Sequence, residues 1–253
     1  MTFSILIPAR YHSTRLVGKP LRMIGGKPLI QHVYERAAAS GAEGIVIATD
    51  DQRIESVARG FGAQVCMTSP GHPSGTDRIA EAIDILGYED ERIVVNLQGD
   101  EPLIPVSALR QVAQNLADHP DAGAATLCEP LHNADLLFDP HVVKVVTDQY
   151  GFALYFTRAA VPWDREAFVE KPPVLPDVPR HYRHIGLYAY RAGFLRSFVR
   201  WPPCELELTE VLEQLRILWY GYKIHVAEAA EPCPAGVDRE SDVARLEAVL
   251  RPA

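Results

Sequence analysis

Short apolar runs alternate with helical patterns through the first half of the chain, and this alternation constrains the fold more than any other feature. Segments of strand type lie at residues 3–8, at 44–51, which ends in acids, at 63–67, and at 92–102, which breaks into a loop; segments with helical spacing lie at 28–40, 54–61, 78–86 and 105–116. Strands that alternate with helices pair in parallel through right-handed crossovers. The sequence therefore predicts an α/β fold with a doubly wound, mostly parallel sheet.

The second half of the chain follows a different pattern. Residues 122–165 are rich in strand signals, and a proline-rich stretch at 170–180 indicates a surface loop. One long helix is expected at 206–220, because its apolar residues follow helical spacing: Leu208, Val211, Leu212, Leu215, Leu218 and Trp219. A strand at 222–229 and a closing helix at 241–250 follow. We expect a single domain over residues 1–253, with a smaller strand-rich insertion at about 122–190.

The composition excludes several classes of protein. The chain has 253 residues and a formal net charge of -8, so we expect it to bind neither nucleic acid nor a membrane surface. Its four cysteines form no C-x-x-C pair, which argues against a zinc site and a disulfide framework. No apolar run approaches the roughly 20 residues that span a bilayer. We therefore expect a cytoplasmic protein with reduced thiols.

A cationic loop follows the first expected strand of this acidic chain. The stretch IPARYHSTRLVGKPL, residues 7–21, carries Arg10, Arg15 and Lys19 among small and turn-forming residues. Ligands of open α/β sheets bind at the carboxyl ends of the strands, where this loop lies. Three cations and nearby backbone N–H groups suit a polyphosphate, although a solvated cationic loop explains the charge equally well. The chain lacks both G-x-x-x-x-G-K-[ST] and G-x-G-x-x-G after a strand, which excludes a P-loop enzyme and an ordinary dinucleotide-binding protein.

Two acidic stretches could complete such a site. Asp100 and Glu101, in NLQGDEP, directly follow an apolar run. Two acids there could hold Mg²⁺, which prefers carboxylate and phosphate oxygens; the alternative is a polar turn. Asp238, in AGVDRESD, could be a second metal ligand, but the residues alone favour a role near the N-cap of the last helix.

Several stretches occur in the same order as in one known family. They are IPARYHSTRLVGKPL, GKPLIQHV, IATD, HPSGTDRIAE, VNLQGDEP, ALYFTRAAVPW, RHIGLYAYRAGF, LEQLRILWYG and GVD. Over nearly its whole length the chain thus resembles the 3-deoxy-manno-octulosonate cytidylyltransferase family. It departs from that family at Val17, where proline is usual, and in the stretch PPCELELTE. Neither departure removes a charged group of the expected site.

The resemblance implies a nucleotidyltransferase fold in which the insertion serves dimerisation and sugar binding. It implies the reaction CTP + 3-deoxy-D-manno-octulosonate (Kdo) → CMP-Kdo + pyrophosphate, for lipopolysaccharide assembly, by a Mg²⁺-dependent homodimer. Two alternatives stay open. A cytidylyltransferase for another 2-keto sugar acid, such as amino-Kdo or a nonulosonate, would differ in its sugar pocket alone. A non-catalytic nucleotide-binding regulator would be expected to lack part of the charged set, which is complete here.

The resemblance also implies roles for individual residues. The expected catalytic residues are Arg10, Arg15, Lys19 and Asp100, and the expected Mg²⁺ ligands are Asp100 and Asp238. The nucleotide is expected to contact Pro8, Ala9, Arg10, Lys19 and the turn formed by Ser74, Gly75, Thr76, Asp77 and Arg78, which would read the cytosine base. An N-cap before the next helix explains that turn equally well without the resemblance, and both roles can hold at once.

The candidate contacts to the sugar acid are polar side chains, most of them in the second half of the chain. They are Gln98, Arg158, His184, Tyr188, Glu210 and Gln214. Taken alone, Glu210 and Gln214 could belong to a solvated face of the long helix, and His184 and Tyr188 could be structural. The surface between the two subunits of a homodimer is expected within residues 122–165.

Overall fold

The structure is a computed structural model that describes residues 1–12, 16–169 and 174–250. Residues 170–173 of the expected proline-rich loop therefore lie outside the described residues. In the part of the chain that is described, none of the helices combines the length and the apolar character needed to cross a bilayer.

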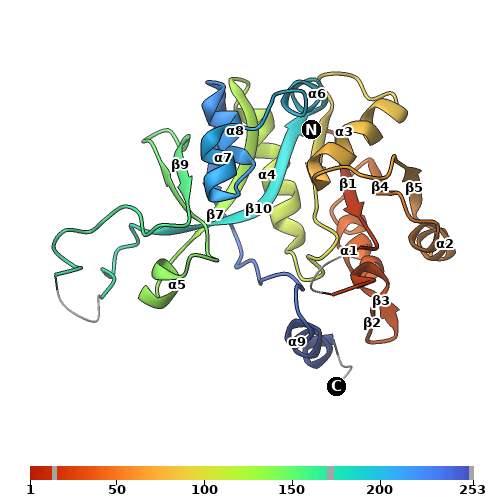
Figure 1. Cartoon of the computed structure of the whole chain (residues 1–253), viewed down its shortest axis with the longest axis horizontal. Helices are drawn as coiled ribbons and strands as arrows, with labels where there is room; N and C mark the ends of the chain where they lie inside the picture. The colour runs from red at the N-terminus through yellow and green to blue at the C-terminus, as the bar shows by residue number, and fades with distance from the viewer. Residues whose placement is uncertain (13–15, 170–173, 251–253) are drawn as a thin grey trace.

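One large sheet forms the centre of the molecule (Figure 1). Its main path runs β11-β7-β10-β6-β1-β4-β5. The strands on this path are β1 (Phe3–Ala9), β4 (Gly44–Thr49), β5 (Gln64–Met67), β6 (Ile93–Asn96), β7 (Ala122–Pro130), β10 (Tyr182–Arg191) and β11 (Lys223–Glu228). β1 pairs in parallel with β4 and β6, and β4 with β5, whereas β10 is antiparallel to both of its neighbours. The predicted doubly wound, mostly parallel sheet is confirmed.

Helices cover both faces of this sheet. Alternate residues of β1 point to opposite faces, as a strand requires: Ile5 and Ile7 belong to one buried cluster and Leu6 to the other. The first cluster holds apolar residues of α1 (Leu29–Ala38), α2 (Gln52–Gly60) and α4 (Val106–Asp118). The second holds those of α3 (Gly75–Ile85), α6 (Ala192–Phe198) and α8 (Gln214–Trp219). The two cores hold the strand ends rigidly enough to support a binding site on their loops.

Helix α3 begins three residues earlier than the sequence predicts. Ser74 is its N-cap, and the Ser74 side chain accepts a hydrogen bond from the backbone N–H of Asp77. Because serine caps stabilise the first turn, residues 75–78 become helical instead of forming a free turn. The stretch SGTDR is therefore both a cap and the first turn of a helix.

The expected long helix at 206–220 is wrong. The chain forms α7 (Glu205–Glu210) and α8, separated by Val211, which has a left-handed φ of 54°. Leu208 and Val211 are exposed at 67% and 75%, while Leu212 and Leu215 are buried, so the apolar residues do not share one stripe. Tertiary contacts explain the break: the Arg158 guanidinium binds the Glu210 carbonyl, and Arg216 pairs with the buried Glu207 across the two helices.

The segment between β7 and β10 projects from the sheet (Figure 1). It contains α5 (Ala134–Phe138) and a hairpin of β8 (Lys144–Thr147) and β9 (Ala153–Thr157), and β8 also pairs with the start of β10. The strands at the two ends of the expected insertion, β7 and β10, are themselves part of the central sheet. Their long antiparallel ladder leaves only the residues between them to project.

Small elements close the structure near the cationic loop. They are the 3₁₀ turn η1 (Lys19–Leu21), the strands β2 (Met23–Ile24) and β3 (Lys27–Pro28), and the closing helix α9 (Glu240–Leu250). Val243 and Leu246 of α9 pack on Ile24 and Leu29 in a separate small core. The segment after β1 and the C-terminal helix are thus joined by apolar packing beside the ends of the central strands.

Two histidines stack between the hairpin and the sheet edge. The rings of His119 and His225 are 3.5 Å apart between centroids, and Phe152 packs against both with its edge. Burial and the neighbouring His119 lower the pKa of His225 to about 4. His225 is therefore neutral in the folded protein at pH values where an unfolded histidine, with a pKa near 6.5, takes up a proton.

We predict that His225→Gln makes folding less sensitive to acid. The pKa of His225 is lower in the folded than in the unfolded protein, so acid favours unfolding. The stability that neutral His225 contributes is complete above about pH 6.5 and is lost as the pH falls toward 4. The loss is at most about 1.4 kcal/mol per pH unit. Urea unfolding at pH 7 and pH 4.5 should show a difference smaller by about 2 kcal/mol in the variant. The exposed His141→Gln is the control, and an equal acid sensitivity of both variants and the parent would contradict the assignment.

Candidate functional site

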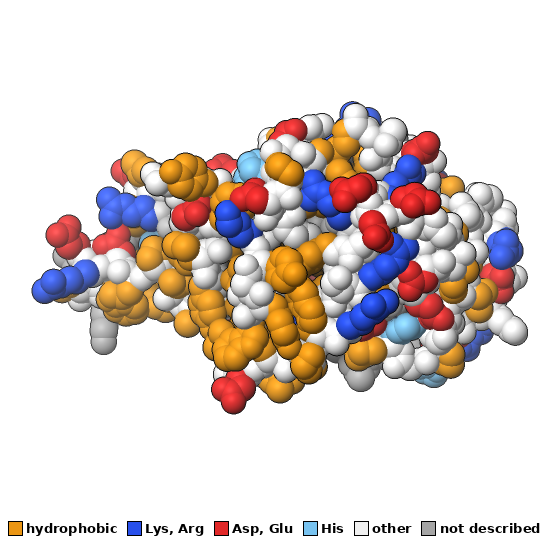
Figure 2. Space-filling view, turned by 90° about the horizontal axis from the view of Figure 1, so that it is seen from above, with side chains coloured by type: hydrophobic (Ala, Val, Ile, Leu, Met, Phe, Trp, Pro, Cys, Tyr) orange, Lys and Arg blue, Asp and Glu red, His pale blue; other side chains and the backbone are white. Residues whose placement is uncertain are grey.

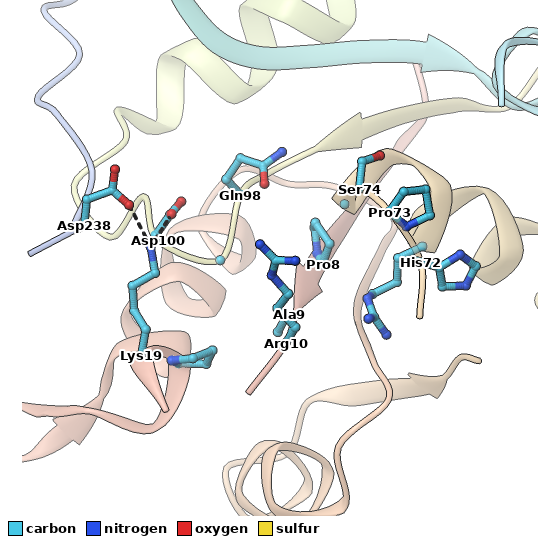
Figure 3. A pocket seen from close by; sticks show the side chains of 14 residues that line it. Pro8, Ala9, Arg10, Lys19, His72, Pro73, Ser74, Gln98, Asp100 and Asp238 are labelled. Carbon is cyan, nitrogen blue, oxygen red and sulfur yellow. Dashed lines mark hydrogen bonds and ion pairs between the residues drawn. The ribbon is translucent and has the colours of Figure 1, made fainter. Parts of the chain in front are cut away.

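A pocket of about 230 Å³ lies at the carboxyl ends of β1 and β6 (Figure 3). Four separated segments meet around it: the end of β1 with the cationic loop, the start of α3 with the residues before it, the loop after β6, and the chain before α9. Its lining residues are Pro8, Ala9, Arg10, Lys19, Pro20, His72, Pro73, Ser74, Gly75, Arg78, Gln98, Gly99, Asp100 and Asp238. This is the position at which open α/β sheets bind ligands.

A lysine held between two carboxylates forms one end of the pocket. The Lys19 Nζ lies 2.7 Å from Asp100 Oδ2 and 3.0 Å from Asp238 Oδ1, and it donates to the Val237 carbonyl at 2.9 Å. Burial alone would lower the pKa of Lys19, but the two carboxylates outweigh it and the pKa is raised. The ammonium group therefore stays charged, and both acids face one cationic position.

Negative charge exceeds positive charge at this end of the pocket. Burial, together with the charges of Asp100 and Asp238, raises the pKa of Glu101 to about 8. The Glu101 carboxyl is thus mostly protonated at neutral pH, because a third carboxylate beside the other two is unfavourable. The two aspartates and the one lysine leave a net negative charge here, which can attract a further cation.

The two aspartates suit a magnesium ion, which also binds phosphates and water, better than a metal enclosed entirely by protein side chains. Among the described residues, no group of three or more histidine, cysteine, aspartate or glutamate side chains could enclose a metal. Mg²⁺ usually takes one or two carboxylates and completes its shell with phosphate oxygens and water. Asp100 and Asp238, which converge beside a pocket, supply that kind of donor set.

The start of α3 forms the opposite side of the pocket. Ser74 and Gly75 line it, and backbone N–H groups of a helix start favour negatively charged ligands. Arg78 lines the pocket although it is only 4% exposed, and its guanidinium is 2.6 Å from Thr68 Oγ1 and 3.3 Å from Asp50 Oδ1. Arg10 extends from the end of β1 into the pocket (Figure 3).

Two of the expected nucleotide contacts do not line the pocket. Thr76 is buried beneath it and donates its hydroxyl to Glu213, and Asp77 accepts a hydrogen bond from the Ser74 hydroxyl at 2.7 Å. Both stabilise the helix start instead of facing open space. Arg15, the remaining member of the expected catalytic set, lies outside the described residues.

The sugar candidates fall into two groups. Gln98 lines the pocket, whereas Tyr188 and Gln214 lie buried behind it and His184 is half-buried beside Tyr188. His184 Nε2 is 3.1 Å from Thr126 Oγ1, and its ring is 5.3 Å from that of Tyr188. The Tyr188 hydroxyl and Gln214 Nε2 have no hydrogen-bond partner among the described residues, which is unusual for buried polar atoms.

Arg158 and Glu210 do not line the pocket. Glu210 accepts hydrogen bonds from the Thr157 hydroxyl at 2.6 Å and the Arg158 N–H at 2.9 Å. The Arg158 guanidinium binds the carbonyls of Glu210, at 2.6 Å, and Pro140, at 2.9 Å. These contacts join β9 to the end of α7, and both side chains are occupied by them.

Two residues that the sequence analysis did not single out belong to this region. His72 lines the pocket, with its Nε2 2.5 Å from Glu81 Oε2. Glu213 is half-buried, and its carboxylate accepts from Thr76, whose hydroxyl also receives a weak bond from Asn96 at 3.5 Å. Burial raises the pKa of Glu213 although the Thr76 hydroxyl opposes the rise. Its position directly before Gln214 in LEQLR was the available signal.

The comparisons with known proteins agree on one family. A family model described as cytidylyltransferase matches residues 4–224. The chain is 58% identical to 3-deoxy-manno-octulosonate cytidylyltransferase of Aliivibrio salmonicida over 99% of both chains, and 55% identical to that of Hahella chejuensis over 98% of this chain and 97% of the relative. A solved CMP:2-keto-3-deoxy-manno-octonic acid synthetase complexed with CTP is 39% identical, with a TM-score of 0.88 over 99% of this chain and 98% of that one. A nucleotidyl transferase of Methanothermobacter, 15% identical with a TM-score of 0.62 over 98% and 97% of the two chains, shares the fold.

We predict that Thr76→Val destabilises the protein by about 1–3 kcal/mol, the cost of leaving a buried acceptor without its donor. Loss of the Thr76 hydroxyl raises the pKa of Glu213 further. The variant should therefore lose more stability at pH 8, where the Glu213 carboxylate must be charged, than at pH 5. Thr76→Ser keeps the hydroxyl and is the matched control. Thermal unfolding of the ligand-free proteins at both pH values measures the effect, and equal losses in the two variants would contradict it.

Proposed function

The chain belongs to the cytidylyltransferase family and, within it, to the 3-deoxy-manno-octulosonate cytidylyltransferases, and from this premise we propose that it transfers the cytidylyl group of CTP to Kdo, releasing pyrophosphate. The hydroxyl on the anomeric carbon of Kdo attacks the α-phosphorus, and the bond from that phosphorus to the β-phosphate oxygen breaks. The observation that carries the proposal is Lys19, held between Asp100 and Asp238 in a pocket that also presents Arg10 and the start of α3.

The triphosphate is bound by the cationic side of the pocket. Arg10 and Lys19 neutralise the phosphates and the charge that develops on the leaving pyrophosphate, and Arg15 belongs to the same proposed set. Ser74 and Gly75 face the base, where the start of α3 offers polar groups beside Pro8 and Ala9. Holding both reactants in line is the main contribution that such a site makes to phosphoryl transfer.

The proposed cofactor is Mg²⁺, held by Asp100 and Asp238. When bound, it would supply positive charge to the phosphates of CTP and to the sugar acid. The protein's own part is to keep the two carboxylates convergent, which Lys19 does through its paired contacts. In the metal-free protein Glu101 is mostly protonated beside them, because burial and the two aspartates raise its pKa to about 8.

The sugar acid is proposed to contact Gln98 and the buried group behind it. Burial and the nearby Arg183 lower the pKa of His184 to about 3. At neutral pH its imidazole is therefore uncharged and can donate one hydrogen bond and accept another. The unpartnered Tyr188 hydroxyl and Gln214 amide offer further bonds to a ligand rich in hydroxyl groups. Arg158 and Glu210 hold β9 beside α7 and would act on the sugar site through that contact.

The direct test is pyrophosphate release from CTP, Mg²⁺ and Kdo. We predict that CTP is preferred over UTP by about ten- to a hundredfold in kcat/KM, because uracil places an acceptor where cytosine has a donor and a mispaired buried polar group costs about 1–3 kcal/mol. Assays with a nonulosonate and an amino analogue of Kdo show which sugar acid is used. Equal turnover of CTP and UTP, or no release with Kdo, would count against the proposal.

We predict that Asp100→Asn lowers turnover by about 10²-fold or more, equivalent to roughly 3 kcal/mol of transition-state stabilisation. The substitution keeps the size of the side chain but removes the charge that faces Lys19 and the proposed metal. CTP affinity, measured by calorimetry, should change far less, because Arg10 and the start of α3 remain. Asp121→Asn, which breaks a surface pair with Lys223, is the control. Near-normal turnover of Asp100→Asn at saturating Mg²⁺ would remove Asp100 from the metal site.

A homodimer is proposed as the assembly, with the biosynthesis of lipopolysaccharide in the cytoplasm as the setting. Large apolar side chains are exposed on adjoining elements: Leu154 of β9 at 63%, and Leu208 and Val211 at the end of α7. Hydrophobic side chains also gather on the face of the molecule seen in Figure 2. Exposed apolar area of this kind marks interaction surfaces in soluble proteins, and Leu154 lies within the expected 122–165 segment.

We predict that a Leu154→Glu/Leu208→Glu double variant shifts the protein from dimer to monomer. Two charges on the apolar surface would have to be desolvated in the interface, which is costly. Light scattering at micromolar concentration gives the mass of each form. Leu136→Glu, which alters a half-exposed leucine on α5, is the comparison. A monomeric parent protein, or an unaltered dimer in the double variant, would contradict this surface.

A further inference from the structure

The chain between β11 and α9, residues 229–238, forms a strap that delivers Asp238 to the pocket. In Figure 1 this segment runs away from β11 toward α9 without regular structure of its own. Its first residue is fixed to the sheet, since the Ala229 N–H donates to the Cys128 carbonyl at 2.8 Å. The placement of Asp238 therefore depends on how the rest of the strap is held.

A pair of charged side chains binds the backbone of one residue, Cys233, in the middle of the strap. The Cys233 N–H donates to Glu129 Oε2 at 3.1 Å, and the Cys233 carbonyl accepts from Arg183 Nη2. Glu129 and Arg183 also bind each other, and they are direct partners in the ladder between β7 and β10. Both backbone groups of Cys233 are thus satisfied by two side chains of the rigid central sheet.

The strap meets the pocket a few residues later. The Val237 N–H donates to the Asp100 carbonyl at 2.8 Å, and Lys19 binds both the Val237 carbonyl and the Asp238 carboxylate. Gly236 passes so close that a Cβ there would lie 2.9 Å from the Asp100 carbonyl oxygen. Small changes in the path of the strap would therefore move Asp238 relative to Asp100.

Helix α9 holds the far end of the strap. The Asp242 carboxylate accepts from the Asp238 N–H at 3.0 Å, and the Arg245 guanidinium binds the carbonyls of Ala235 and Gly236. These contacts orient the strap against α9, whereas the Glu129–Arg183 pair is the charged grip from the central sheet on Cys233. Asp100 lies on the loop after β6, which belongs to the same sheet. The contacts of Glu129 and Arg183 with Cys233 therefore position both aspartates relative to the central sheet.

We propose that Glu129 and Arg183 are positioning residues: by holding the Cys233 peptide they place Asp238 beside Asp100 in the geometry that a divalent cation requires. The proposal rests on the proposed function, since it assigns the use of that geometry to Mg²⁺. Glu129 and Arg183 form their pair with only 21% and 25% of the side chains exposed, so the pair is well ordered against the sheet. The ladder joins β7 to β10 without them, so their distinctive contribution is the path of the strap.

The test compares Arg183→Met with a matched control, Arg196→Met. Arg196 is similarly exposed, at 20%, and likewise binds acids, Asp84 and Asp90, and one backbone carbonyl, that of Tyr88. It lies on α6, away from the strap. Both variants lose a charged pair and a hydrogen bond to one backbone carbonyl, and only Arg183→Met releases Cys233.

The first readout needs neither metal nor activity. In the metal-free protein with EDTA, hydrogen exchange of the peptide covering residues 229–239 should become at least about tenfold faster in Arg183→Met and stay at the parent rate in Arg196→Met. Exchange of β6 in the core should be unchanged in both. The second readout is the Mg²⁺ concentration for half-maximal pyrophosphate release, which should rise about tenfold in Arg183→Met alone, with kcat at saturating Mg²⁺ within about threefold of the parent.

Unchanged strap exchange in Arg183→Met, or the same Mg²⁺ requirement in both variants, would overturn the proposal. If Arg183→Met does not fold, Glu129→Gln, which keeps the shape of the side chain but weakens its bonds, should show both changes in the same direction at about threefold. If the parent protein releases no pyrophosphate from CTP and Kdo, the proposed function fails, and direct Mg²⁺ titration of the nucleotide complexes replaces the second readout.

Discussion

The contact of one lysine with two carboxylates is the interaction on which the candidate site depends. Lys19 joins a 3₁₀ turn near the N-terminus, the loop after β6 through Asp100, and the C-terminal strap through Asp238. Two carboxylates so close together would repel each other without a cation between them. Lys19 supplies that cation permanently, and Glu101 avoids adding a third charge by keeping its proton. The proposed binding of phosphates and of a divalent cation rests on this arrangement of charges.

Behind the pocket, the protein keeps polar groups in places where most proteins bury apolar ones. Thr76 and Glu213 bind each other there, so the first turn of α3 is tied directly to α8. Tyr188 and Gln214 retain buried polar atoms without partners. Such atoms are costly in a folded chain, and the cost is understandable if a hydroxyl-rich ligand satisfies them. The proposed base contacts at the start of α3 and the proposed sugar contacts around Gln214 are then linked through Thr76 and Glu213.

The parallel part of the fold was predictable because its signals are local. The first strand, at 3–8, and the strand that begins at 92 are each followed by polar residues where ligands gather. The helix at 206–220 could not be predicted correctly, because its break at Val211 arises from Arg158 and from the pair of Glu207 with Arg216, which come from other parts of the fold. Helical spacing shows only that a segment can form a helix by itself. Here contacts with other parts of the fold outweighed the helical preference of residues 206–220.

By itself the sequence determined the alternation of strands and helices, the cationic loop, the acids after β6, and the family to which the chain belongs. Only the tertiary structure decided which of these residues meet. It placed Asp238 against Lys19, although the two are 219 positions apart, and it used Glu210 to hold β9 instead of lining the pocket. The physical reason is that charge pairing and burial act through space, whereas composition and periodicity are read along the chain.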